Sequence, residues 1–479
     1  MAPKRRQARP PDPEPEPARE EQQEQDEDQE DQSEEDPEDS DSHLPLPFYN
    51  TTFSAHRLSP LHLGTEPLSP NRLQLLAQRL RDTLVGDVIR GVHVGAAAAD
   101  DDAGSVVGRA GALERVDIAW VGVGDVLGFN GGEGGLEGLL GEGGGGEHGQ
   151  GGEGWRQLAQ GLHEKKALHI SLRYEMASCT ALMLPLLAGD GESGMEEAKM
   201  RFSVGGGHGR GGADEMDWEH SVDPAHFLSL PLLLVRMPPP LKAIVGEFLS
   251  TTFDCRASPM RLGTRSLVGI WEAWIKSAGL PSRGPLARDV VLSLGFYVPP
   301  PESKPAQTSK EEVPAEQHQP LGLKSVDVII PAAELRRFTD AGERVAATQG
   351  KQAALRTGWG WEGDPKKRRK LAGRLYEEGW EWRTKSQEDG SPPSHQPFTE
   401  ALACYLKEHL ALNLFHPGVR VIKIACGGFA MSESRLKLFA PVDSKGGEDE
   451  RSPVLAHKGA VLELLGSLVS KAQLQPVAL

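Results

Sequence analysis

The chain has 479 residues and a formal net charge of −17, with 38% hydrophobic and 6% aromatic residues. Residues 1–42 hold 17 acidic and five basic side chains, so the other 437 residues carry only −5 and a globally basic, nucleic-acid-binding composition is excluded. We expect this acidic tail, residues 1–42, to be disordered, because it has too little apolar surface to offset the entropy of ordering.

The spacing of the cysteines and the lengths of the apolar runs narrow the class of protein further. The four cysteines include no Cys-x-x-Cys pair, which predicts reduced thiols rather than a disulfide framework or zinc ribbon. No signal peptide and no window of eighteen apolar residues is found, so we expect a soluble, intracellular protein without a membrane partner.

The first ordered element in chain order is a helix. Ser69 and Pro70 are typical of an N-cap and a first helical residue, and apolar residues then recur at helical spacing: Leu73, Leu76, Leu80 and Leu84. Strands are predicted over residues 88–94, 116–121, 168–174 and 227–235.

The second half of the chain continues this mixture. Helices are predicted to begin at Pro239 and Pro331 and to cover residues 267–275, 398–412 and 457–472. Strands are predicted over residues 290–297, 325–330, 419–426 and 435–439. Without regular βαβ alternation, this order favours an α+β fold with a largely antiparallel sheet and packed helices.

Low-complexity segments divide the predicted elements into regions. We predict an N-terminal α+β region over residues 43–298, a linker over 299–320, and a C-terminal α+β region over 321–479. Insertions are expected within them, two rich in glycine and one rich in charge and tryptophan: residues 128–154, 189–212 and 340–396.

The sequence offers no motif for catalysis, a metal or a cofactor. Gly122 to Gly128 follows a predicted strand, but its glycine spacing is one residue longer than a dinucleotide loop requires. His220 and His226 lack the spacing of helical metal ligands. We therefore predict a non-enzymatic protein with no cofactor.

A basic motif is the clearest local signal. Five consecutive cations match a nuclear localisation signal: Lys366, Lys367, Arg368, Arg369 and Lys370. Tryptophans flank this motif, namely Trp359, Trp361, Trp380 and Trp382. They could stack on single-stranded nucleic acid, but docking of the insertion onto the body or onto a partner is the favoured interpretation.

Three stretches resemble one family. They are Phe53 to Leu63 with Arg79 to Val88, then Arg236-Met237-Pro238 through Phe253-Asp254 to Gly263, and the carboxy-terminal strand pair that ends at Leu438. Together they resemble the fungal form of the centromere protein L (CENP-L) family, whose members are subunits of the inner kinetochore.

The resemblance implies a nuclear scaffold subunit, located at the centromere and kinetochore, that pairs with a partner like centromere protein N (CENP-N). It also implies a curved sheet whose carboxy-terminal half forms the heterodimer. Carried over to this sequence, the partner interface would lie on two strands, at Val419, Val421, Ile422, Ile424, Leu436 and Leu438. Addition of a partner strand at an exposed edge would explain such an interface, although the same strands could equally lie inside the sheet.

A DNA-binding or recombination-associated nuclear protein is the alternative function. It would use basic side chains on and after the first helix to neutralise phosphates: Arg72, Arg79, Arg81 and Arg90. A solvated helix face explains the same arginines without DNA.

Overall fold

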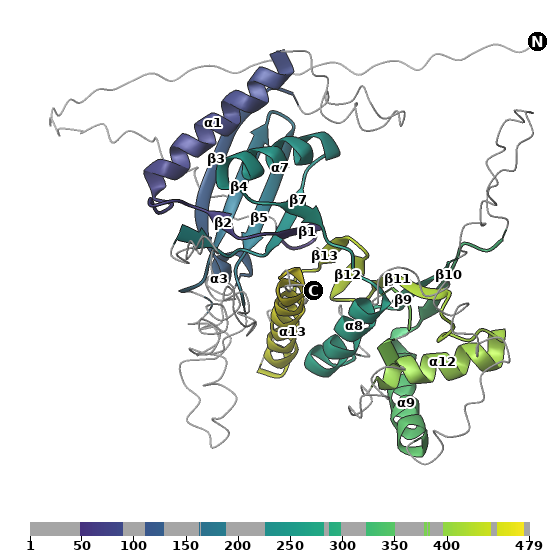
Figure 1. Cartoon of the computed structure of the whole chain (residues 1–479). Coiled ribbons are helices and arrows are strands. Elements are labelled where there is room, and N and C mark those ends of the chain that lie inside the picture. Colours follow the sequence, from purple (N-terminus) through teal and green to yellow (C-terminus); the bar gives the residue numbers. More distant parts are fainter. Residues whose placement is uncertain are drawn as a thin grey trace, which may run out of the picture. The chain divides into compact units, whose positions relative to one another are not determined.

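A computed structural model of the chain describes residues 48–89, 111–128, 162, 164–187, 226–281, 287–297, 322–349, 378–380, 382–383, 396–441 and 448–473. These residues form an α+β fold around a large antiparallel sheet, as the element pattern predicts (Figure 1). The acidic tail, the linker, the basic motif and both glycine-rich insertions lie outside the described residues, apart from Gly128 at the start of one insertion.

The main sheet has 11 strands in the order β10-β9-β11-β12-β13-β1-β7-β5-β4-β3, and β8 pairs with β1 off this path. Its strands are β1 (Thr52–Leu58), β3 (Leu113–Gly122), β4 (Lys166–Tyr174), β5 (Ala177–Leu184), β7 (Leu232–Arg236), β8 (Ala257–Pro259), β9 (Val290–Phe296), β10 (Ser325–Ile330), β11 (Val419–Ala425), β12 (Phe429–Ser432) and β13 (Arg435–Leu438). A second, two-stranded sheet pairs β2 (Leu61–His62) with β6 (Phe227–Leu228).

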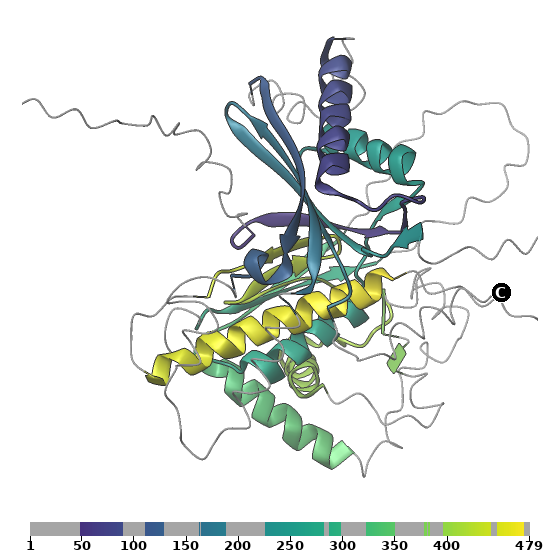
Figure 2. The same cartoon turned by 90° about the vertical axis from the view of Figure 1, so that its left-hand side faces the viewer.

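Two helices cover one face of the sheet formed by β3, β4, β5 and β7. They are α1 (Pro70–Ile89) and α7 (Pro239–Phe253), seen near these strands in Figures 1 and 2. The leucines that set the helical period of α1 are all buried against this face. Burial of such apolar side chains is the main source of stability for the helix.

The second core lies between the sheet and the helices of the carboxy-terminal half. These are α8 (Thr264–Ala278), α9 (Leu335–Gln349), α12 (Pro397–Leu410) and α13 (Glu448–Ala472), together with the short elements α3 (Val123–Val126) and η2 (Ala332–Glu334). Helix α13 contacts α8 and also β1 and β7, and Figure 2 shows it running beneath several strands.

Two sequence predictions need correction. Residues 88 and 89 continue helix α1 instead of beginning a strand, and residues 90–94 lie outside the described residues. The strand predicted over 227–235 is two strands in different sheets, β6 and β7. Pro231 lies between them and has no N–H to donate to a continuous ladder.

Contacts in the structure join the N-terminal and C-terminal regions that the sequence predicts. The described residues after Pro45 belong to one compact unit. Strand β9 and helix α8, both placed by sequence in the N-terminal region, contact β10, β11 and α13 of the C-terminal region. The division at residues 299–320 stays a prediction, because those residues are outside the described part of the chain.

Candidate interaction surfaces

One buried carboxyl group, that of Glu272, has structural partners. Glu272 of α8 is 4% exposed and accepts hydrogen bonds from the backbone N–H of Thr399 at 2.9 Å and from its Oγ1 at 2.7 Å. Burial raises the pKa of this carboxyl, and the bonds from Thr399 oppose that rise. Since Thr399 lies in the first turn of α12, Glu272 satisfies a helix N-terminus from a distant element.

Two of the buried thiols are held in their neutral form. Burial raises the pKa of Cys255 and of Cys426 to about 11, which keeps both thiols protonated and poorly nucleophilic. Within the described ranges, no group of three His, Cys, Asp or Glu side chains is placed to hold a metal ion. Among the described helices, none combines the length and apolar character that a membrane crossing requires.

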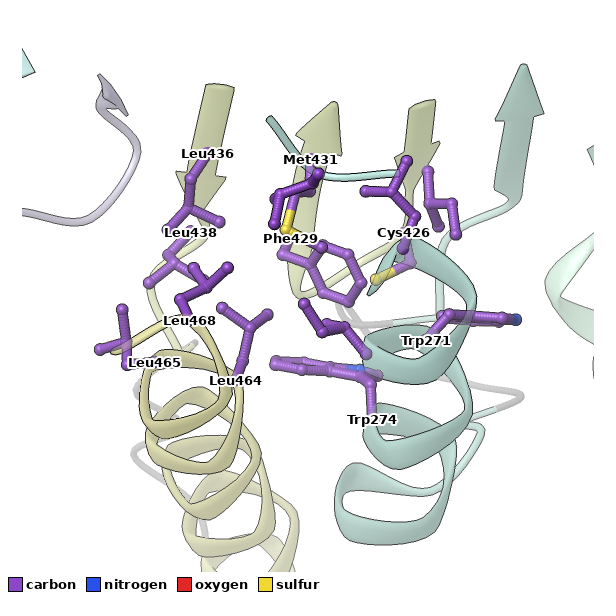
Figure 3. Packing of buried hydrophobic residues seen from close by; sticks show 14 of the residues in the cluster. Trp271, Trp274, Cys426, Phe429, Met431, Leu436, Leu438, Leu464, Leu465 and Leu468 are labelled. Carbon is purple, nitrogen blue, oxygen red and sulfur yellow. The ribbon is translucent and has the colours of Figure 1, made fainter. Parts of the chain in front are cut away.

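The two strands predicted to form the partner interface lie inside the sheet. Strand β11 is hydrogen-bonded between β9 and β12, and β13 between β12 and β1. Five of the six predicted interface side chains are buried in the core: Val419, Val421, Ile424, Leu436 and Leu438. Figure 3 shows Leu436 and Leu438 directed toward Leu465 and Leu468 of α13. The sequence left open whether these strands form an exposed edge or lie inside the sheet. In the structure they lie inside the sheet, so neither strand offers an open edge.

The open edge of this half of the sheet is β10 instead. In the order of described strands, β10 is terminal and pairs only with β9. Ile329 on this strand is 62% exposed, and Leu323 just before it is 67% exposed. Ile422, the sixth predicted interface residue, is 41% exposed and contacts Gly295 of β9. Ile329 therefore lies on the terminal strand, Leu323 directly precedes that strand, and Ile422 lies two strands further in.

The arginines proposed for DNA contact do not share one environment. The Arg72 guanidinium donates to the backbone carbonyl of Leu63 at 3.0 Å and to that of Glu66, so it fastens the preceding loop to α1. Arg79 and Arg81 are exposed on the same helix. Arg90 is outside the described residues.

Two tryptophans of the charged insertion are docked on the body. Trp380 and Trp382 are each 3% exposed, and the Trp380 indole N–H donates to the Val419 carbonyl at 3.1 Å. The Trp380 ring also meets Phe415 edge to face at 5.0 Å. For these two residues the structure confirms docking as the better interpretation, while Trp359, Trp361 and the basic motif Lys366 to Lys370 lie outside the described residues.

Comparison with known protein families identifies a relationship. The family model of centromere protein L (CENP-L) matches residues 47–473 of this chain. No curated protein matches it in a sequence comparison. Since the match runs from the start of the folded body to the end of α13, the chain belongs to the CENP-L family, a family of structural proteins associated with the kinetochore at centromeres in the nucleus.

Proposed function

We propose that this chain is a non-enzymatic scaffold subunit of the inner kinetochore. In this proposal it forms a heterodimer with a CENP-N-like partner through its carboxy-terminal half and helps to link centromeric chromatin to the kinetochore during chromosome segregation. Membership of the CENP-L family indicates that its partners are, in general, proteins of the inner kinetochore. The specific partner and the heterodimer are inferred.

The open edge at β10 is the observation that carries this proposal. A terminal strand presents backbone N–H and C=O groups that a partner strand can pair with, and apolar side chains beside them add buried area. Ile329 and Leu323 supply such side chains along this edge. Of the six interface residues predicted from the sequence, Ile422 is exposed on the face of the sheet two strands inside this edge, and the other five would hold β11 and β13 in the sheet.

Co-purification of the full chain with the CENP-N-like protein of the same organism tests the proposal. Leu323→Lys combined with Ile329→Lys places two cations at the contact, and we expect the affinity to fall by about tenfold or more, because each buried charge lacks a partner. Leu75→Lys is the matched control, since Leu75 is 65% exposed on α1. Equal recovery of the partner by the double variant and the control would refute this edge as the interface.

We further propose that the basic motif at residues 366–370 directs nuclear import. Five adjacent cations are the pattern that import receptors recognise. Replacing all five with alanine should leave the protein in the cytoplasm, as seen by fluorescence microscopy of the tagged full chain. The basic cluster Lys4 to Arg6 is replaced in the same experiment, so that a second signal does not mask the result.

Direct DNA binding is the competing function, and the exposure of Arg79 and Arg81 favours it. If these side chains neutralise phosphates, Arg79→Ala with Arg81→Ala should weaken binding to duplex DNA and reduce the dependence of log K on log salt by about 0.9 for each lost contact. Unchanged binding and an unchanged salt dependence would assign both arginines to a solvated helix face.

A further inference from the structure

A groove of about 450 Å³ opens where strand β7 ends. Its walls come from six elements: the start of β1, Tyr174 at the end of β4, the start of β5, the end of β7, the first turn of α7, and Arg435 of β13. None of these elements contributes to the β10 edge, so the groove is separate from the partner surface proposed above.

The groove exists because the central strand stops before its neighbours do. Pairing of β5 with β7 runs from Leu184↔Leu232 to Thr180↔Arg236, and pairing of β1 with β7 begins at Ser54↔Val235. Residues 177–179 of β5 and residues 52–53 of β1 extend beyond these last pairs. Pro238 and Pro239 follow, and since proline has no N–H, the chain leaves the ladder and starts α7.

The space between β1 and β5 therefore lies where a continuation of β7 would run. Two strands that flank a third lie about 9.6 Å apart, twice the spacing of neighbouring strands. The floor of the groove is apolar, because four buried hydrophobic residues of the core under α1 and α7 line it: Cys179, Val235, Met237 and Leu241. An extended peptide could place alternate side chains on this floor while its backbone pairs with the flanking strands.

Cations surround the groove. Arg236, Lys242 and Arg435 all line it, and among the described residues that line it there is no Asp or Glu. Arg435 pairs across the sheet with Ser54, another lining residue. Burial and the positive charge of Arg435 both lower the pKa of Lys242. An anion bound between these two side chains would relieve their mutual repulsion.

We propose that this groove binds an extended acidic segment of another protein, which adds a strand in continuation of β7 and pairs its carboxylates or phosphates with Lys242, Arg435 and Arg236. Charge complementarity selects this occupant over a neutral or basic peptide. The apolar floor selects a peptide with alternating hydrophobic side chains over a nucleic acid, whose recognition would need phosphate contacts and base-stacking aromatic side chains.

Fluorescence anisotropy with the full chain tests the proposal. The probe is a short labelled peptide in which glutamate alternates with valine, and its counterpart has glutamine in place of glutamate. We expect the glutamate peptide to bind and the glutamine peptide to bind at least about tenfold more weakly. Lys242→Glu with Arg435→Glu should reduce binding of the glutamate peptide by a similar factor.

A control variant makes the result specific to the groove. Arg79→Glu with Arg81→Glu changes the net charge equally at exposed positions on α1, and it should bind the peptide as the unmodified chain does. Equal losses in both double variants, or no loss in either, would overturn the proposal. So would a duplex DNA probe that binds through Lys242 and Arg435 while the peptide does not bind.

Amide hydrogen exchange tests the strand itself. Peptide binding should slow exchange within residues 52–53 and 177–179 at alternate amides, those whose N–H points into the space that the new strand would fill. Peptide binding without slower exchange there would refute strand addition. Slow exchange before the peptide is added, abolished by Lys242→Glu and Arg435→Glu, would assign the groove to an acidic segment of this chain and overturn an external partner.

Failure of the groove proposal can be distinguished from failure of the proposed function. The Lys242→Glu and Arg435→Glu variant should still co-purify with the CENP-N-like protein, because the groove and the β10 edge share no residue. Conversely, the Leu323→Lys and Ile329→Lys variant should still bind the acidic peptide.

Discussion

His169 is a residue whose environment makes stability depend on pH. Its Nε2 lies 2.7 Å from the Thr180 hydroxyl across the β4–β5 pair. Burial lowers the pKa of this imidazole from 6.5 to about 4, and nearby Asp117 partly opposes the shift. The folded state therefore binds fewer protons than the unfolded state between these pH values, so this residue's contribution to stability is complete above pH 6.5 and declines as the pH falls toward 4.

Replacing His169 should flatten that pH dependence. We expect the free energy of unfolding of the unmodified chain to decline by up to about 1.4 kcal/mol per pH unit more than that of His169→Gln in this range. Urea denaturation followed by circular dichroism at a series of pH values measures the difference. Parallel profiles for the two proteins would show that His169 titrates normally in the folded state.

The docked segment around Trp380 is held by contacts with several elements, including β11 and helix α8. Trp380 fits between Phe415 and Trp382, with its N–H on the Val419 carbonyl of β11. Truncation to alanine removes a large buried side chain, and we expect Trp380→Ala to destabilise the protein by about 3–5 kcal/mol.

Phenylalanine at the same position separates packing from hydrogen bonding. Trp380→Phe keeps most of the apolar area and leaves the Val419 carbonyl without its donor, which should cost about 1–3 kcal/mol. Both variants are compared by chemical denaturation of the full chain. A loss for Trp380→Phe as large as that for alanine would mean that the hydrogen bond, not the ring, holds the segment.

Elements with strong periodicity or clear caps could be predicted from the sequence. Pro70 and the leucine period specify α1, and Pro239 and Gly279 mark the start of α7 and the end of α8. Strand β5 was missed because both its faces are buried, so Ala177 to Leu184 shows no alternation. Strand β1 was missed because half-exposed polar residues interrupt its pattern.

The pairing of strands could not be predicted, and with it the location of the surfaces. The two strands of the predicted interface were recognised correctly, but their neighbours β9, β12 and β1 decide whether they have an open edge. The groove likewise depends on where β7 ends relative to β1 and β5. Such registers are set by contacts between distant residues, which no local pattern records.

At the scale of the whole described body, the sheet joins both halves of the chain. Strand β1 pairs with β7 of one half and β13 of the other, and α13 contacts β1 and β7. The two hydrophobic cores should therefore unfold together, because loss of either removes the support of the shared strands.

Thiol labelling during denaturation measures this coupling. Cys179 and Cys255 are buried in the core under α1 and α7, and Cys426 in the core under α8 and α13. Pulsed alkylation at increasing urea concentrations, read by mass spectrometry, should give all three thiols the same midpoint. Two separate midpoints would show that the halves unfold independently.

The pairing of β1 with β13 also bears on how the chain is made. Phe53 is among the first residues of the body to leave the ribosome, and its cross-strand neighbour Leu436 is among the last. The start of β1 therefore cannot pair with Leu436 until synthesis of the body is almost complete. Contacts between residues so far apart in the sequence also form slowly. A chain truncated before residue 435 would lack the strand that pairs with the start of β1. We expect such a chain to be bound by chaperones and degraded by proteases, and not to act as a shorter subunit.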